Sequence, residues 1–178
     1  MKVFKAVLLI FVLIIGSGCS YYSGISGKVV DSVTGKPIEG AIVVAQWTAA
    51  RGWLGEQQRE LHKIVETLTD KEGKFSLSGT MGFALDPPEM IIYKEGYIPW
   101  RNDMVFPSCN IVKDHEWKNN VVYNLSTMTN KYTAEQLNQF MDSGIVGYGY
   151  APMYNKIHNE VSYKSINESR TIRDNITK

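Results

Sequence analysis

The chain of 178 residues carries 19 lysines and arginines and 18 aspartates and glutamates, which gives a formal net charge of +1. Because no block of basic residues accompanies this charge, the sequence lacks the electrostatic pattern of a nucleic-acid-binding protein. Hydrophobic residues make up 44% and charged residues 21%; this composition excludes a disordered or fibrous chain, and the length fits one domain with a single core.

The first 18 residues have the pattern of a secretory signal. Lys2 and Lys5 flank the start of an apolar run at residues 6–15. As a helix this run would rise about 15 Å, which is half of the ~30 Å hydrocarbon core of a bilayer. It is therefore too short to span a membrane comfortably, and it is typical of the apolar middle of a signal peptide. Small residues at 16–18 then lead to Cys19.

The segment GSGCS resembles a bacterial lipobox, in which small residues before a cysteine admit the processing enzymes and the thiol carries a diacylglycerol. Gly16 stands where that pattern usually has Leu. The resemblance predicts a lipoprotein signal peptide at 1–18, and a membrane anchor made of acyl chains on Cys19. Ser20 implies, by similarity to enteric lipoproteins, the periplasmic face of the outer membrane. The alternative is an ordinary signal peptide followed by an incidental cysteine.

Cysteine usage agrees with an anchor, because Cys19 and Cys109 are the only two cysteines. In an exported chain such a pair would normally suggest a disulfide. Lipidation of Cys19 would leave Cys109 without a partner in the chain. We expect Cys109 to be a small buried apolar residue, because no basic cluster near it in the sequence would make it reactive.

After a predicted polar tether at 19–24, short β-branched runs separated by turn residues predict a sandwich over 25–126. The segment ISGKVVD at 25–31 is the first expected strand, and Gly35 and Pro37 belong to the turn that follows. Gly40 suggests a bulge or a close backbone approach. In the next strand, alternation sends one set of side chains to each face. The first set is Ala41, Val43, Ala45 and Trp47, and the second is Ile42, Val44 and Gln46.

Later segments repeat this pattern. Residues 64–79 predict two strands joined by a four-residue hairpin from Asp70 to Gly73. Further strands are expected within 89–101 and 119–126. Because no helices separate the strands, the pattern favours an antiparallel β-sandwich over parallel β-α-β units.

The order GKVVDSVTGKPIEGAIV, TLTDKEGKFSLSG and IIYKEGY resembles the carboxypeptidase regulatory-like domain, over about residues 25–125. This resemblance implies an all-β fold, namely an antiparallel seven-stranded Greek-key β-sandwich of the transthyretin-like (prealbumin-like) type. It also implies an accessory domain without catalytic residues. The matching positions are Gly27, Asp31, Gly35, Pro37, Gly40, Ala41, Thr69, Asp70, Gly73, Phe75, Gly96 and Tyr97.

Two inserts, at 48–63 and 101–118, and an extension at 127–178 depart from this pattern. In the extension, Thr133 and Gln136 are typical of a capping box and Gly144 of a helix end, which predicts a short helix at about 134–142. We expect this helix to cover Ile42 and Val44. The segment after it is expected to be a loop, and the polar tail from 167 is expected to fray.

Patterns of catalytic and metal-binding residues are missing from the sequence. The three histidines have no spacing that would place two metal ligands on one element, and no G-x-S-x-G nucleophile motif occurs. Four glutamates would have to meet in space to form a glycosidase-like pair. We therefore expect no enzyme, no cofactor and no metal site. The residues considered are His62, His115, His158, Glu56, Glu60, Glu66 and Glu89.

Trp53 and Trp117 lie in the two inserts and are the candidate ligand contacts. Their rings either close the ends of the sandwich or stack on sugars. The sequence favours a lipid-anchored protein of the bacterial cell envelope whose sandwich binds a protein or glycan partner without catalysis. The alternative is a carbohydrate-binding module for envelope glycans. A hydrolase would need convergent acid and base groups that the sequence does not provide.

Overall fold

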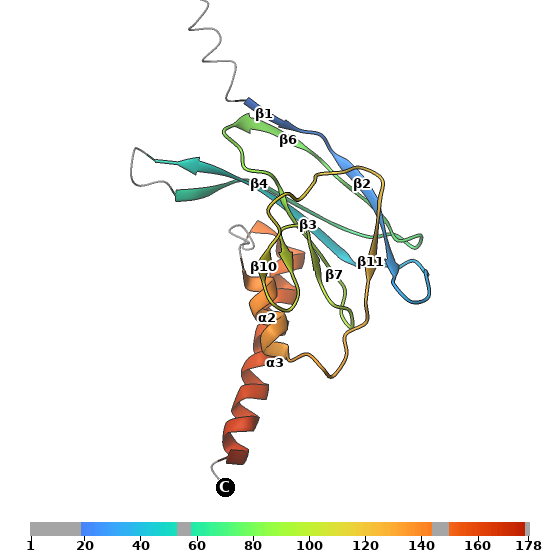
Figure 1. Ribbon diagram of the computed structural model, residues 1–178, viewed down its shortest axis with the longest axis vertical. Helices are drawn as coiled ribbons and strands as arrows, with labels where there is room; N and C mark the ends of the chain where they lie inside the picture. Colours follow the sequence, from blue (N-terminus) through green and yellow to red (C-terminus); the bar gives the residue numbers. More distant parts are fainter. Residues whose placement is uncertain (1–18, 53–57, 144–149, 177–178) are drawn as a thin grey trace, which may run out of the picture.

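The computed structural model describes residues 19–52, 58–143 and 150–176. They form a β-rich, sandwich-like domain with two helices packed on one face (Figure 1). The strands are β1 Cys19–Tyr22, β2 Ile25–Asp31, β3 Ile42–Arg51, β4 Gln58–Leu68, β5 Lys74–Leu77, β6 Thr80–Phe83, β7 Glu89–Tyr93, β8 Trp100–Arg101, β9 Met104–Val105, β10 Asn110–Ile111 and β11 Val121–Leu125. The helices are α2 Ala134–Asp142 and α3 Pro152–Ile176.

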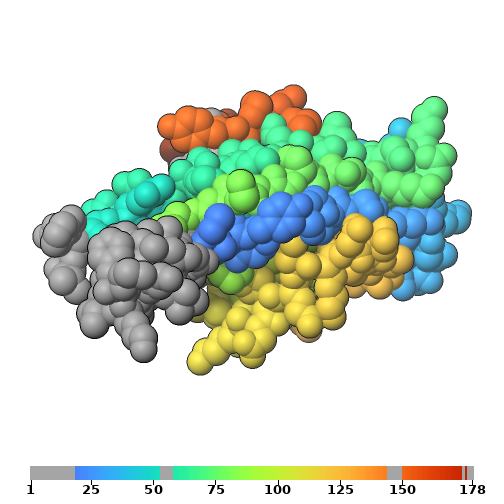
Figure 2. Space-filling model, turned by 90° about the horizontal axis from the view of Figure 1, so that it is seen from above, coloured from blue at the N-terminus to red at the C-terminus, as the bar shows by residue number. Residues whose placement is uncertain are grey.

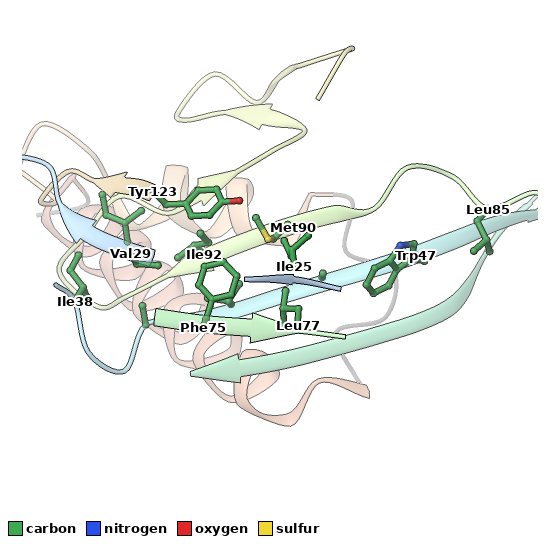
Figure 3. Close-up of a cluster of buried hydrophobic side chains, with 14 of the residues drawn as sticks. Ile25, Val29, Ile38, Trp47, Phe75, Leu77, Leu85, Met90, Ile92 and Tyr123 are labelled. Carbon is green, nitrogen blue, oxygen red and sulfur yellow. The ribbon is translucent and has the colours of Figure 1, made fainter. Parts of the chain in front are cut away.

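Two sheets enclose the main core. One has the strand order β11-β2-β5 and the other β4-β3-β7-β8. Side chains of both sheets point toward one another (Figure 3). Phe75 and Tyr123 from the first sheet meet Ile92 from the second in one buried cluster. The main core is thus the dry interior expected of a sandwich, and Val121 packs against it partly buried.

Strand β3 alternates as expected from its sequence. Ala41, just before β3, Val43, Ala45 and Trp47 are buried in the main core. Ile42 and Val44 are buried in a second cluster, on the opposite face of the same sheet, together with Met141 of α2 and Tyr154 of α3. The expectation that a C-terminal helix covers Ile42 and Val44 is confirmed. Most of the helical contribution comes from α3, however, which was not expected.

The strand directions depart from the predicted pattern in one pair. β11 runs parallel to β2, with Val121 opposite Gly27 and Leu125 opposite Asp31, whereas antiparallel pairing was expected throughout. The connection from β8 to β11 passes through the short β9–β10 hairpin, so β11 enters its sheet at the end where β2 begins. The described residues form eleven strands in four sheets, and the two main sheets together hold seven of these strands.

The segment expected to be a tether at 19–24 begins with strand β1, which pairs along its whole length with β6. Gly79 permits this pairing. A Cβ added at Gly79 would lie 2.0 Å from the carbonyl oxygen of Tyr22, a separation that real side chains do not reach. The chain therefore enters the domain directly at Cys19, with no free linker between Cys19 and the sheet.

Two turns contain glycines with positive φ angles. In the β4–β5 hairpin, the Asp70 side chain accepts hydrogen bonds from the backbone N–H groups of Glu72 and Lys74, and Gly73 has φ +73°, as its sequence predicts. Gly40 has φ +66° in a turn before β3. This turn stands where a bulge or a close backbone approach was expected; a Cβ added at Gly40 would meet the side-chain nitrogen of Lys94 at 3.2 Å and no backbone atom beyond its chain neighbours.

Helix α2 begins with the predicted capping box. The Thr133 hydroxyl accepts from the N–H of Gln136, and the Gln136 side chain accepts from the N–H of Thr133. At the other end of α2, the Arg101 guanidinium donates to the carbonyl oxygens of Phe140 and Ser143. A cation placed there stabilises the helix dipole and satisfies carbonyls that the helix leaves free.

Helix α3 takes up residues 152–154 of the segment expected to be a loop and residues 167–176 of the tail expected to fray, whereas residues 144–149 of that segment lie outside the described residues. Its first residue is Pro152, which suits a helix start because that position needs no N–H donor. The apolar contacts Tyr154, Ile157 and Val161 recur at helical spacing and pack on the sheet and on α2. From there α3 continues as a largely exposed helix, beyond the sandwich (Figure 1).

Glu66 of β4 caps the start of α3. Its two carboxylate oxygens accept hydrogen bonds from the N–H groups of Met153 and Tyr154, each at 3.1 Å. These N–H groups have no partner within the helix, and a negative charge at a helix N-terminus is also favourable. The contact joins residues 87 and 88 positions apart and fixes α3 on β4.

We expect Glu66→Ala to lower the free energy of unfolding by about 1–2 kcal/mol, as loss of a helix cap usually does. Urea unfolding followed by circular dichroism measures this change. Glu60→Ala on the same strand is the matched control, because Glu60 is exposed. Equal effects of the two substitutions would contradict the capping role of Glu66.

Candidate functional site

Cys19 is an exposed free thiol at the first position of β1, opposite Phe83 of β6. Figure 2 looks onto this end of the molecule, where the N-terminal strand, in blue, lies at the surface. A diacylglycerol on a thiol needs open space, and the position of Cys19 provides it. Because β1 is paired, any group on Cys19 is held next to the folded domain.

Cys109 is also a free thiol, but it is half-buried, where full burial was expected. It has φ +54° in the turn between β9 and β10, and its Sγ lies 3.8 Å from the carbonyl oxygen of Pro107. A turn at the surface cannot bury a side chain as a strand in the core does. Cys109 therefore belongs to the local turn and not to the core.

Of the two candidate ligand contacts, Trp117 closes the sandwich. Its ring meets Trp47 edge-on at 5.4 Å between centroids, and its indole N–H donates to the carbonyl oxygen of Ser23 at 2.8 Å. This geometry occupies both the ring and its polar group. Trp53 lies outside the described residues.

The three histidines stay apart in the fold. His62 is exposed beside Thr80, His115 is half-buried near the carbonyl of Val112, and His158 is buried with Nε2 3.3 Å from the Asp142 carboxylate. Within the ranges that the structure describes, no group of three His, Cys, Asp or Glu side chains could hold a metal ion.

Two of the four candidate glutamates already serve the fold. Glu66 caps α3, as described above. Glu89 is buried and accepts hydrogen bonds from Gln46 and Arg59. Arg59 also contacts Asp86 at 3.2 Å, so these side chains form one ion-pair network on the outer face of the β4-β3-β7 sheet. Glu60 is exposed, and Glu56 lies outside the described residues.

A cavity of about 470 Å³ lies between the end of β7, the segment before α2, and helices α2 and α3. Its wall contains three tyrosines, three glutamates and one lysine among fifteen lining residues. Such a surface suits a polyhydroxyl or cationic group, because rings stack on such groups and carboxylates accept their hydrogen bonds. The residues that define this chemistry are Tyr93, Tyr97, Tyr132, Glu95, Glu160, Glu168 and Lys164.

Sequence reasoning did not find this cavity, because five of its fifteen lining residues come from α3, which the sequence was not expected to form. Glu160, Lys164 and Glu168 follow one another at a spacing of four residues, which places them on one side of a helix. The four-residue spacing is the sequence signal for this side of the cavity. It indicates a shared face only if residues 152–176 form a helix.

Burial raises the pKa of Tyr93 to about 12, and the carboxylates of Glu95 and Glu160 add to the shift. Burial likewise raises the pKa of Tyr154. In the unfolded chain a tyrosine ionises near pH 10. The stability contributed by neutral Tyr93 is therefore complete below pH 10, and it is lost as the pH rises toward 12.

We expect the free energy of unfolding to fall by about 2–3 kcal/mol through Tyr93 as the pH rises from about 10 to 12. Unfolding by urea across this pH range measures the loss. Tyr93→Phe should flatten the curve, whereas the matched change Tyr163→Phe on the exposed face of α3 should not. A curve that Tyr93→Phe leaves unchanged would contradict this account.

Neither helix of the described chain combines the length and apolarity that crossing a membrane requires.

Comparison with known proteins adds little. No family model matches the sequence, and no curated protein matches it either. Among solved structures, one match is a streptococcal ancillary pilin with 16% sequence identity and a TM-score of 0.33. The match covers 61% of this chain and 30% of that one, so this chain spans less than a third of the pilin. The strands and sheets of the described residues define the fold class as a β-rich, sandwich-like domain.

Proposed function

We propose that this protein is a lipoprotein of the bacterial cell envelope, anchored by acyl chains on Cys19, whose sandwich binds a partner without catalysis. The observation that carries the proposal is the exposed thiol of Cys19 at the start of β1. It follows an apolar run too short to span a bilayer and a small-residue segment that resembles a lipobox. Ser20, directly after Cys19, favours the periplasmic face of the outer membrane as the location.

We also propose that the domain is a carboxypeptidase regulatory-like sandwich of the transthyretin-like type. Support comes from the glycines that carry the resemblance. Gly35, Gly40, Gly73 and Gly96 all have positive φ, between 66° and 84°, which residues with a Cβ rarely adopt. The division of the two main sheets into three and four strands is compatible with this proposal.

The partner site is the cavity beside α2 and α3. Eleven of its fifteen lining residues belong to the C-terminal extension, and the other four follow or end β7, within the segment that resembles the family. Its tyrosines and carboxylates favour a glycan or a protein segment with hydroxyl or basic groups. Of the four glutamates considered for an acid–base pair, Glu66 and Glu89 have their carboxylates engaged in the fold.

Labelling cells with radioactive palmitate tests the anchor. We expect the wild-type protein to take up label and to remain with the membrane fraction, and Cys19→Ala to lose both properties. Cys109→Ala is the matched control, since it removes the only other thiol. Label that persists in Cys19→Ala would overturn the proposed function.

A further inference from the structure

The two-stranded sheet of β1 and β6 has one face that is apolar and uncovered. Cys19 lies opposite Phe83, and Tyr21 lies opposite Met81. Directly opposed residues of a strand pair point to the same side, and so do residues two apart. These four side chains therefore share one face, which we call the anchor face. Tyr21, Met81 and Phe83 are 73%, 65% and 64% exposed.

The other face of the same sheet points inward. Tyr22 packs against the main core, and a Cβ added at Gly82 would come within 3.0 Å of the His62 ring. Ser20 and Thr80 are half-buried on this side. Because the inner face is held by packing, the sheet cannot turn over, and the anchor face is fixed toward the outside.

Exposed apolar side chains are concentrated on the anchor face. The described residues contain twelve large apolar side chains that are exposed, and three of them lie in these two four-residue strands. None of the four residues of the anchor face carries a formal charge. A compact apolar area with an exposed cysteine at its corner needs a partner that suits both features.

We propose that the anchor face lies in the interfacial layer of the membrane and fixes the orientation of the domain; this rests on the proposed lipidation of Cys19. The strand rise places Tyr21 about 7 Å from Cys19, and Phe83 is its direct cross-strand neighbour at about 5 Å. Acyl chains on Cys19 would hold the thioether at the lipid headgroups. With no free linker after Cys19, these side chains must lie at nearly the same depth.

The chemistry of the anchor face suits this layer. Tyrosine presents an apolar ring and a polar hydroxyl and is enriched at membrane interfaces. Buried apolar area adds to the binding of the acyl chains. The far end of α3 lies at the opposite end of the molecule from β1 and β6 (Figure 1). The membrane would thus leave α3 free to meet a partner.

Site-directed spin labelling tests the anchor face on the lipidated chain. Met81→Cys, Phe83→Cys and Val33→Cys, each combined with Cys109→Ser, are purified from membranes and placed in vesicles of phosphatidylethanolamine and phosphatidylglycerol. Val33 is the control, because it is an exposed apolar residue in a turn away from the β1–β6 sheet. Power saturation compares the access of oxygen with that of a water-soluble nickel complex.

We expect labels at Met81 and Phe83 to favour oxygen over the nickel complex, with a positive depth parameter, and the Val33 label to give a negative one. Equal, water-like values at all three positions would overturn the proposal. Spin–spin broadening at Met81 would also overturn it, since a second copy of the chain would then cover the face. Palmitate labelling of the same variants separates the two proposals: an aqueous face on a palmitate-labelled protein refutes only the orientation, whereas missing palmitate refutes the anchor itself.

Discussion

Arg101→Met is expected to lower the free energy of unfolding by about 3–5 kcal/mol, the usual cost of removing one partner of a buried ion pair. The Arg101 side chain is completely buried and forms a two-point pair with Asp103, at 2.9 Å and 2.7 Å. Its remaining nitrogen donates to the carbonyls of Phe140 and Ser143 at the end of α2. Methionine would leave the Asp103 carboxylate and both carbonyls without this donor.

The double variant Arg101→Met/Asp103→Leu separates charge from packing. Removing both charges should recover part of the loss, because an uncompensated buried carboxylate is the largest single cost. Urea unfolding of the wild type, the single variant and the double variant completes the comparison. If the single variant were as stable as the wild type, Arg101 would not be the link between β8 and α2.

Trp47→Ala is the second large effect, and we expect a loss of about 3–5 kcal/mol. Trp47 is fully buried in the main core between the two sheets. Alanine would leave a cavity that the surrounding strands cannot fill, because their backbones are fixed by pairing with their neighbours. Thermal and urea unfolding measure the change.

Trp117→Ala tests whether its ring packs on the domain or awaits a ligand. Loss of the edge-on contact with Trp47 and of the hydrogen bond to Ser23 should cost about 1–3 kcal/mol. A ring held open for stacking on sugars would contribute almost nothing to folding. Unchanged stability in Trp117→Ala would therefore favour ligand contact over closure of the sandwich.

Several parts of the fold could be predicted because their signals are local. The alternation from Ala41 to Trp47 correctly assigned each apolar residue to one of two buried clusters. The Asp70 to Gly73 hairpin and the capping box of Thr133 and Gln136 depend on hydrogen bonds within four residues. Hydrogen bonds between residues so close in the chain can be predicted from the residue types alone.

The missed parts depend on contacts distant in sequence. Helix α3 is mostly polar, and its start is capped by Glu66, which lies 87 residues earlier. The parallel direction of β11 depends on the path of the chain from β8. Pairing of β1 with β6 depends on the close approach permitted by Gly79. No pattern within any one of these segments reveals its partner.

The candidate site likewise has one part that the sequence predicts and other parts that depend on the fold. The five-residue segment GSGCS predicts Cys19 as the lipidated residue, and the structure places Cys19 exposed at the surface. The anchor face could not be foreseen, because Met81 and Phe83 join Cys19 only through the β1–β6 pairing. The cavity beside α3 is likewise assembled from segments that meet only in the folded chain.

Mass spectrometry of the N-terminal peptide tests the central claim most directly. After isolation from membranes and digestion with trypsin, a lipoprotein should yield a peptide from Cys19 to Lys28 that carries the mass of a diacylglycerol on its cysteine. The Cys109 peptide should carry no such mass. A Cys19 peptide with an unmodified thiol, or one still joined to residues 6–18, would contradict anchoring through this residue.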